Sequence, residues 1–379
     1  MKRFIILLVM STARSRELPL AEECVESFCK PPNCRCSSTN IPGNLAPRDT
    51  PQFVIVSFSD AINIVNIGTY RQVLYGRRNS NGCNAGATFF VTHENNNYQL
   101  VNELHNQGFE IALHSITKSI PQSYWAEATY DIYYKEFAEQ IFQMTAFANV
   151  SRSAIKGMRI PFLQMGGNAS FELALDLDLY DNTWQTNAFT GPGLWPYTLD
   201  FASIQECINP PCPTACLPGA WVLPLISWRD LTGSPCTVVD ACYSSPDQDD
   251  EDSWYGFMLS NFERHYLGNR APFNIYIQES YVNSFPAIKR AFTRFLDLIN
   301  NLHDVFQVNS YEVIKWVKNP LPLNEYREKP CQEPFAPIDC TATQCGPLAA
   351  EHNGNEYWMK ICTDLCPTSY PWYGNPLGA

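Results

Sequence analysis

The stretch PQFVIVSFSD, Pro51 to Asp60, largely decides the fold. Its apolar run is typical of a buried strand, and two polar side chains, Ser59 and Asp60, follow where that strand ends. Enzymes often place a pair of carboxylates at such a point. Here one of the two is a serine, so the stretch predicts either an active site or the remains of one.

Similar apolar runs of strand length recur along the chain and alternate with helix-like segments. The expected strands are residues 52–58, 87–92, 109–115, 221–227, 273–278 and 305–310. The expected helical segments are residues 97–108, 123–148, 252–269 and 284–302. Strands that alternate with helices and are apolar on both faces predict an α/β fold whose parallel sheet is closed, or nearly closed, into a barrel.

Polar residues follow three of the expected strands. They are the pair Ser59–Asp60, His114, and the pair Gln278–Glu279. In barrels of this type the chemistry lies at the C-terminal ends of the strands, so we expect these side chains to converge on one mouth.

The two ends of the chain differ from the middle in composition. Residues 1–16 have a basic start and a short apolar run and are expected to be a signal peptide. We expect a Cys-rich extension over residues 17–51, a barrel over 52–320, and a Cys- and Pro-rich extension packed on the barrel over 321–379.

Fifteen cysteines indicate an oxidising compartment and a framework of disulfides. Their spacing does not give two well-separated CxxC knuckles, which argues against zinc clusters. An odd count leaves at least one thiol unpaired or bonded to another chain. Five of the cysteines lie in an irregular insertion between Phe201 and Tyr243, which is a candidate for one wall of a groove.

The formal net charge of -12 argues against nucleic acid or an anionic membrane as a partner. An acidic run, Asp247 to Trp254, lacks the Gly and terminal Glu of a calcium loop. It is expected to be a solvated flank that favours the start of the next helix.

Several phrases, in order along the chain, resemble the insect chitin deacetylases, within the family-four carbohydrate esterases. They are CRCSS, GATFFVTHENNNYQLVNELHNQGFEIALHSIT, GMRIPFLQMGGN, LYDNTW, GLWPYTLDF, RAPFNIYI and VIKWVKNP. The resemblance implies a distorted (β/α) barrel of the polysaccharide deacetylase type without a separate chitin-binding module. It also implies a divalent metal, usually zinc, held by one Asp and two His, with a second Asp as base and a further His as acid.

Mapped onto this sequence, the catalytic motifs of the family are changed at three positions. Asp60 and His114 match metal ligands, but Lys118 stands where the third ligand belongs. A protonated lysine repels a cation. Ser59 matches the position of the base, and Gln278 that of the general acid. Neither side chain can perform that role near neutral pH.

The motifs that shape the groove are retained. Arg159, Pro161 and Phe162 match the third motif, in which the Arg orients the base. Asp181 and Trp184 match the fourth, in which the Asp supports that Arg and the aromatic lines the groove. We therefore expect an ion pair between Arg159 and Asp181, and substrate contacts from Pro161, Phe162 and Trp184.

Together these positions predict a secreted chitin-binding protein on a deacetylase scaffold, located in an extracellular chitin matrix such as a cuticle or a gut lining. The expected partner is chitin or its N-acetylglucosamine oligomers, with no nucleic acid, membrane or cofactor. An alternative is an active or weakly active deacetylase with zinc on Asp60 and His114 and a substitute base, Asp181 or Glu279. A third reading is a role in protein interaction without affinity for glycans.

Overall fold

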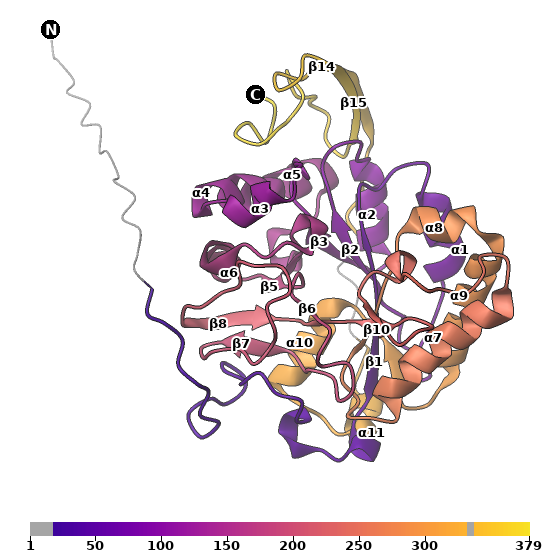
Figure 1. Cartoon of the computed structure of the whole chain (residues 1–379). Helices are drawn as coiled ribbons and strands as arrows, with labels where there is room; N and C mark the ends of the chain where they lie inside the picture. Colours follow the sequence, from indigo (N-terminus) through magenta and orange to yellow (C-terminus); the bar gives the residue numbers. More distant parts are fainter. Residues whose placement is uncertain (1–17, 332–336) are drawn as a thin grey trace, which may run out of the picture.

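The computed structural model describes residues 18–331 and 337–379 of the chain (Figure 1). The expected signal peptide, residues 1–16, lies outside this part. No helix in the described ranges combines the length and the apolar character that a membrane crossing requires.

A mixed sheet of nine strands forms the centre of the molecule. Its order is β12-β1-β2-β3-β4-β5-β8-β7, and β13 pairs with β1. The strands are β1 (Gln52–Ser59), β2 (Thr88–Val91), β3 (Glu110–Leu113), β4 (Gly157–Met158), β5 (Tyr180–Asp181), β7 (Tyr197–Leu199), β8 (Leu217–Val222), β12 (Phe273–Tyr276) and β13 (Val305–Gln307). Every pairing is parallel except that of β7 with β8.

Strand β1 is the central element because it pairs with β12, β13 and β2. Its first seven residues are all buried, as a continuous apolar run in a parallel sheet requires. Only Ser59, at its C-terminal end, is partly exposed. The strand that the opening stretch predicts is therefore confirmed.

The sheet curves into a half-barrel, and its path ends at β12 on one side and β7 on the other. Side-chain hydrogen bonds link β12 to the segment that follows β8. The indole of Trp228 donates to the Asn274 carbonyl at 2.7 Å, and the Asn274 amide donates to the Ile226 carbonyl at 3.0 Å. The predicted class, an α/β distorted barrel with disulfide-rich extensions, is confirmed.

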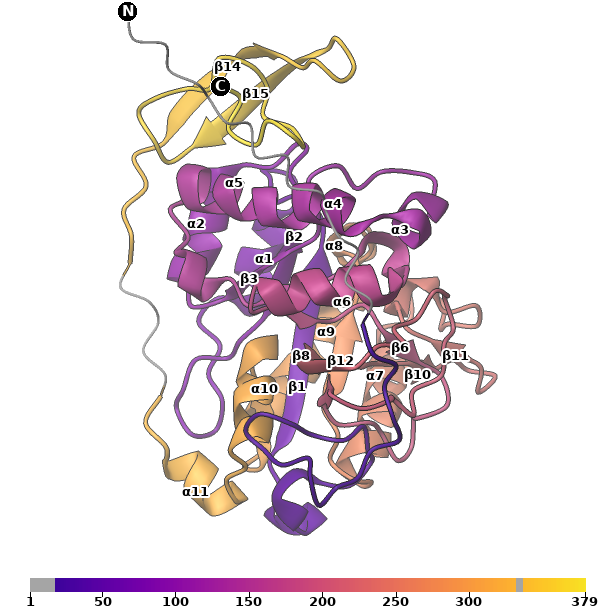
Figure 2. The ribbon, with the colours of Figure 1, turned by 90° about the vertical axis from the view of Figure 1, so that its left-hand side faces the viewer.

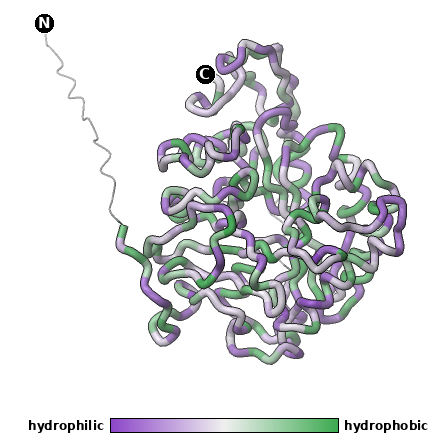
Figure 3. The backbone as a smooth tube through the Cα atoms, in the orientation of Figure 1, coloured by the Kyte–Doolittle hydropathy of each residue, from purple (hydrophilic) through white to green (hydrophobic). Residues whose placement is uncertain are grey.

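Helices cover the outside of the sheet. They are α1 (Ile67–Leu74), α2 (Tyr98–Asn106), α3 (Ser123–Glu127), α4 (Tyr130–Tyr133), α5 (Glu139–Ala148), α6 (Gly167–Asp176), α7 (Glu251–Tyr266), α8 (Glu279–Ser284), α9 (Pro286–Asn301), α10 (Ser310–Lys318) and α11 (Leu323–Glu328). A π-helical turn, Tyr134–Ala138, joins α4 to α5. Figure 3 shows hydrophilic and hydrophobic residues interspersed along the whole backbone. In α9 the buried residues recur every three or four positions, as amphipathic packing requires.

Helix α7 begins within the acidic run, at Glu251. The Asp250 side chain accepts a hydrogen bond from the Ser253 amide at 3.0 Å, so it caps the helix. Glu251 and Asp252 follow in the first turn, where negative charge is favourable. The acidic run therefore serves the start of α7, as the sequence predicts.

Seven disulfides join fourteen of the fifteen cysteines. They are Cys24–Cys36, Cys29–Cys34, Cys83–Cys331, Cys207–Cys212, Cys236–Cys242, Cys340–Cys362 and Cys345–Cys366. Cys216 is the free cysteine. A framework of this density is typical of an oxidising compartment.

The C-terminal extension contains a hairpin, β14 (Thr343–Ala349) with β15 (Glu356–Ile361), that lies above α2 and α5 (Figures 1 and 2). The Cys362 amide donates to the Phe147 carbonyl of α5 at 2.7 Å. His93, in the loop after β2, lies 2.7 Å from the Pro371 carbonyl. These bonds hold the extension on the barrel, while the domain boundaries themselves remain predictions.

Candidate active site

The polar residues that follow successive strands lie at one end of the sheet. Each residue just beyond a strand donates its amide to the neighbouring strand: Asp60 to Phe90, His114 to Val91, Arg159 to Leu113 and Asn182 to Met158, at distances between 2.9 and 3.1 Å. This regular ladder brings β1, β3, β4 and β5 to a common edge. The predicted convergence of Asp60 and His114 follows from it, and Gln278 and Glu279 are not part of this ladder.

Arg159 forms the floor of this site and is fully buried. Its guanidinium donates to the hydroxyls of Ser59 and Ser57, both at 3.0 Å. It also donates to the carbonyl and the side-chain oxygen of Asn182. Burial lowers the pKa of Arg159 to about 10. The hydrogen bonds of this buried cation thus all go to neutral oxygens.

The rings of Phe90 and Tyr276 also contact the guanidinium, with ring centres 3.9 and 4.2 Å from Cζ. Cation–π contacts of this kind are strongest where the charge is removed from water. They help to offset the cost of burying Arg159.

The expected ion pair between Arg159 and Asp181 is wrong. No ion pair in the described part of the chain includes Arg159. Asp181 instead accepts the backbone amides of Thr183 at 2.9 Å and Trp184 at 3.3 Å, which fixes the turn after β5. Burial raises the pKa of Asp181 to about 6.

Lys118 and Asp60 form an ion pair across the mouth. The Lys118 ammonium lies 3.4 Å from an oxygen of Asp60. The side chains are 38% and 61% exposed, so water screens the pair and it contributes about 0–1 kcal/mol. Lys118 has φ +47°, a left-handed conformation that is unfavourable for a residue with a Cβ.

His114 is buried and oriented by the backbone. Its Nδ1–H donates to the Arg159 carbonyl at 2.7 Å, which leaves Nε2 with its lone pair. Burial, with a further contribution from the charge of Lys118, lowers the pKa of His114 to about 3. The ring is therefore neutral at physiological pH.

These residues do not fit the metal that the family motif implies. Asp60 and neutral His114 provide two donors of suitable chemistry, but catalytic zinc sites keep three protein ligands. The third position carries the ammonium of Lys118, which already pairs with Asp60. Within the described ranges, the one cluster with metal-ligand spacing is Cys24, Cys29 and Cys36, and these cysteines are already in disulfides.

Gln278 follows β12 and faces the irregular insertion. Its side chain is exposed, and its backbone amide donates to the Asp240 carboxylate at 3.0 Å. Burial raises the pKa of Asp240. The insertion therefore contacts the chain at Gln278, the residue that matches the general-acid position of the family.

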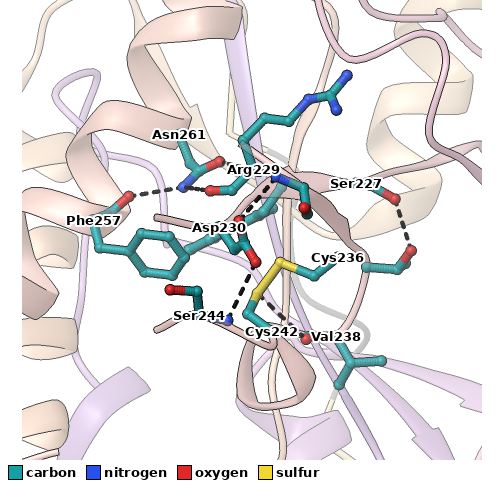
Figure 4. The surroundings of a disulfide bond; sticks show 12 residues. Ser227, Arg229, Asp230, Cys236, Val238, Cys242, Ser244, Phe257 and Asn261 are labelled. Atoms are coloured by element: carbon teal, nitrogen blue, oxygen red, sulfur yellow. Dashed lines mark hydrogen bonds between the residues drawn. A yellow bond between two sulfur atoms is a disulfide. The ribbon is translucent and has the colours of Figure 1, made fainter. Parts of the chain in front are cut away.

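Figure 4 shows how the insertion is held in place beside the Cys236–Cys242 disulfide. The Asn261 side chain of α7 bonds both backbone groups of Arg229, at 2.7 and 3.1 Å (Figure 4). The Ser244 amide donates to Asp230 at 3.2 Å. This wall is fixed to α7 by hydrogen bonds and closed on itself by a disulfide.

Comparison with known proteins identifies the family. Chitin deacetylase 8 of Bombyx mori is 60% identical over 382 residues, which cover 100% of both chains. The chain belongs to the chitin deacetylase family. Chitin deacetylase 1 of Bombyx mori is 35% identical over 379 residues, which cover 94% of this chain and 69% of that protein.

No family model matches the sequence. Among solved structures, the chitin deacetylase from the fungal pathogen Colletotrichum lindemuthianum aligns with 71% of this chain and 90% of its own, with 10% identity and a TM-score of 0.38. That likeness concerns the fold alone.

Of the three groove residues expected in this chitin deacetylase family member, only Phe162 is at the surface. Its side chain is 44% exposed, and its backbone has φ +60°. Pro161 is buried. Trp184 is 3% exposed, packs against Phe171 and donates its indole N–H to the Glu206 carbonyl at 2.9 Å. The expectation that Trp184 lines the groove is therefore wrong.

Three residues of the site had no role in the sequence analysis: Ser57, Asn182 and Asp240. Alternation along β1 places Ser57 on the same side as Ser59, so its position was open to prediction. Asn182 directly follows Asp181 and takes the Arg159 contact expected of that carboxylate. Asp240 reaches the mouth only through the folding of the insertion, for which the sequence carries no pattern.

Proposed function

We propose that this member of the chitin deacetylase family is a secreted protein that binds chitin but does not deacetylate it in the manner of the family. The observation that carries the proposal is the Lys118–Asp60 pair. The Lys118 ammonium stands at the third ligand position, 3.4 Å from the Asp60 carboxylate that would hold the metal. Positive charge there opposes the binding of a divalent cation.

The residues at the base and acid positions also do not support the proton transfers of deacetylation. At the position of the base, the Ser59 hydroxyl accepts a hydrogen bond from Arg159, a cation that opposes protonation of its neighbour. At the position of the acid, Gln278 has an amide that cannot supply a proton. Loss of each such function typically costs about 10²–10⁴ in rate.

The scaffold around the mouth is nonetheless complete. Arg159 is held by a full set of hydrogen bonds, the insertion is fixed beside Gln278, and Phe162 is exposed three residues after Arg159. An exposed ring offers a surface on which the apolar face of a sugar can stack. The disulfides support an extracellular location, and the proposed binding of chitin makes a chitin matrix, such as a cuticle or a gut lining, the location that we propose.

Sedimentation with insoluble chitin tests the binding. The full chain is expected to co-sediment with chitin and not with cellulose, and Phe162→Ala to bind more weakly. Leu267→Ala, which removes an exposed apolar side chain at the end of α7, serves as the control and should bind normally. Absence of binding by the parent protein would contradict the proposal.

A second candidate function is deacetylation itself. It is favoured by the full-length identity of 60% to the Bombyx mori protein named chitin deacetylase 8. It requires Lys118 to release Asp60 so that Asp60 and His114 can hold zinc, and it requires a substitute base. The two carboxylates considered for that role are poorly placed: Asp181 is 2% exposed and caps a turn, and Glu279 is 8% exposed on α8.

A further inference from the structure

The hairpin of the C-terminal extension has one buried face and one open face. Met359 and Ile361 of β15 are buried with the main core, and Tyr357 stacks on Tyr370 at 4.2 Å. Because successive side chains of a strand point to opposite sides, the residues between them face outward. This outer face consists of Gln344, Pro347, Glu356, Trp358 and Lys360.

Trp358 dominates the outer face. Its side chain is 61% exposed, an unusual position for the largest apolar residue. The indole lies across Gly346 of β14, where an added Cβ would come within 2.8 Å of ring atom Cε3 and 2.9 Å of Cδ2. Gly346 also has φ +131°. A glycine at this position lets the ring lie close against the neighbouring strand.

The two strands around this ring are linked to each other and to the end of the chain, and the ring itself is accessible. The Cys345–Cys366 disulfide is adjacent to Gly346, and the Gln344 side chain donates to the Met359 carbonyl at 3.1 Å. Glu356 and Lys360 flank Trp358 on β15 with opposite charges. A flat apolar ring between charges that cancel suits a neutral, polar partner rather than a polyanion or a polycation.

We propose that this outer face is a second glycan-binding surface, on which Trp358 stacks against one face of a pyranose ring of a β-linked N-acetylglucosamine polymer. Such a sugar carries its substituents in the plane of the ring and presents flat C–H faces that pack on an indole. The choice of polymer rests on the proposed function. The surface lies on β14 and β15, so it is separate from the mouth at the ends of β1, β3, β4 and β5.

Two surfaces on one rigid body would let the protein engage an insoluble matrix at two points. Linked sites raise the overall affinity for a polymer well above that of either site. The effect is greater for insoluble chitin than for an oligomer too short to reach both surfaces.

The test compares binding isotherms on insoluble chitin for full-length parent and variants. Trp358→Ala is expected to weaken binding about three- to tenfold, and Trp358→Phe to retain most of it, because a ring remains. Leu365→Ala is the matched control, since it removes another exposed apolar side chain of the same extension, 82% exposed. Equal thermal stability of the four proteins confirms that the fold is intact.

Fluorescence gives a direct second readout. Soluble N-acetylglucosamine oligomers should shield Trp358 from iodide quenching in the parent, and the shielding should be absent in Trp358→Ala. If the parent binds chitin and Trp358→Ala binds equally well, this inference is wrong and the proposed function stands. If Trp358→Ala alone abolishes all binding, the groove is not a binding site. If the parent does not bind chitin, both proposals fail.

Discussion

At the scale of the residue, the defining feature of the site is a buried arginine that has no carboxylate among its hydrogen-bond partners. Arg159 is held by two serine hydroxyls, an asparagine and two aromatic rings. A buried charge normally depends on a paired charge. Ser59 matches the position of the base in the family motif, so under the proposed function one carboxylate would supply both the base and the partner of Arg159.

Ser59→Asp should therefore stabilise the protein without restoring activity. The new carboxylate would meet the Arg159 guanidinium, now 3.0 Å from the serine oxygen, and form a charge-assisted bond in place of a neutral one. We expect the free energy of unfolding to rise by about 1 kcal/mol, measured by chemical denaturation. Ser59→Asn has similar size without charge and should give no gain; an equal gain in that control would contradict this explanation.

Lys118 is expected to contribute less to the free energy of unfolding than its position in the motif suggests. A buried unpaired Asp60 would cost several kcal/mol, but its side chain is 61% exposed. Lys118→Ala should change the free energy of unfolding by less than about 1 kcal/mol.

Lys118→Gly separates the charge from the backbone at this position. It removes the same ion pair but also relieves the φ of +47°, so it should be more stable than Lys118→Ala by about 1 kcal/mol. Thermal and chemical unfolding of both variants provide the measurement. A loss of several kcal/mol in Lys118→Ala would show that Asp60 depends on the pair after all.

Apolar runs in the sequence allowed Asp60, His114 and Gln278 to be predicted at the ends of parallel strands, whereas Arg159 was assigned to the site only through the resemblance to the family. The sequence did not allow their partners to be predicted. Hydrogen bonds from Arg159 to neutral oxygens leave no pattern of opposite charges in the sequence. A tryptophan such as Trp184 is the same residue in the sequence whether it lines a groove or is buried in the core.

At the scale of the element, the length of a strand decides whether it can be predicted from the sequence. The long buried run of β1 could be recognised from its apolar residues alone. Strands β4 and β5 have two residues each, too few for any periodicity to appear. The hairpin β14–β15 was expected only as a tail, because its Cys- and Pro-rich composition masks the alternation of its strands.

The loop after β2 joins the barrel to the extension through a buried histidine. His93 lies 2.7 Å from both the Tyr98 hydroxyl and the Pro371 carbonyl. Burial lowers the pKa of His93 to about 3, and the nearby His352 contributes to the same shift. Tyr370 and Trp372 of the extension pack against the ring.

This contact should destabilise the protein in mild acid. Between the ordinary pKa of 6.5 and about 3, the unfolded chain binds a proton at His93 and the folded chain does not, so stability falls as the pH falls. From pH 7 to pH 5 the contribution is about 2 kcal/mol. Chemical denaturation at both values should show a smaller loss for His93→Gln than for the parent.

Comparing parent and variant is necessary because other buried groups titrate in the same range. The pKa of His265 is lowered to about 4, so this histidine, like His93, lowers the free energy of unfolding as the pH falls. The raised pKa of Asp181, about 6, acts in the opposite direction, because the folded state then takes up the proton. An identical pH dependence in parent and His93→Gln would refute the assignment.

At the scale of the whole molecule, one disulfide, Cys83–Cys331, ties the C-terminal extension to the barrel, and the other six lie within the extensions and the insertion. Cys83–Cys331 joins residues 248 positions apart, whereas Cys29–Cys34 closes a loop of sequence separation 5. In the chain-entropy description, a cross-link that closes a longer loop restricts the unfolded chain more.

Replacing Cys83 and Cys331 together by Ser should lower the free energy of unfolding by about 2–5 kcal/mol. The matched control replaces Cys29 and Cys34 by Ser, which removes the same chemistry from a short loop and should cost less. Chemical denaturation of both double variants under oxidising conditions is the measurement. A control that loses as much stability as the long-range variant would rule out the loop-length explanation.

Under the proposed function, the mouth has kept its architecture and lost its chemistry. Acetate release from N-acetylglucosamine oligomers, with and without added zinc, tests it most directly. The triple variant Ser59→Asp, Lys118→His and Gln278→His serves as the reference, because residues that act as one catalytic unit must be restored together. We expect no acetate from the parent above a heat-inactivated control and zinc-dependent release from the triple variant; zinc-dependent release by the parent itself would contradict the claim.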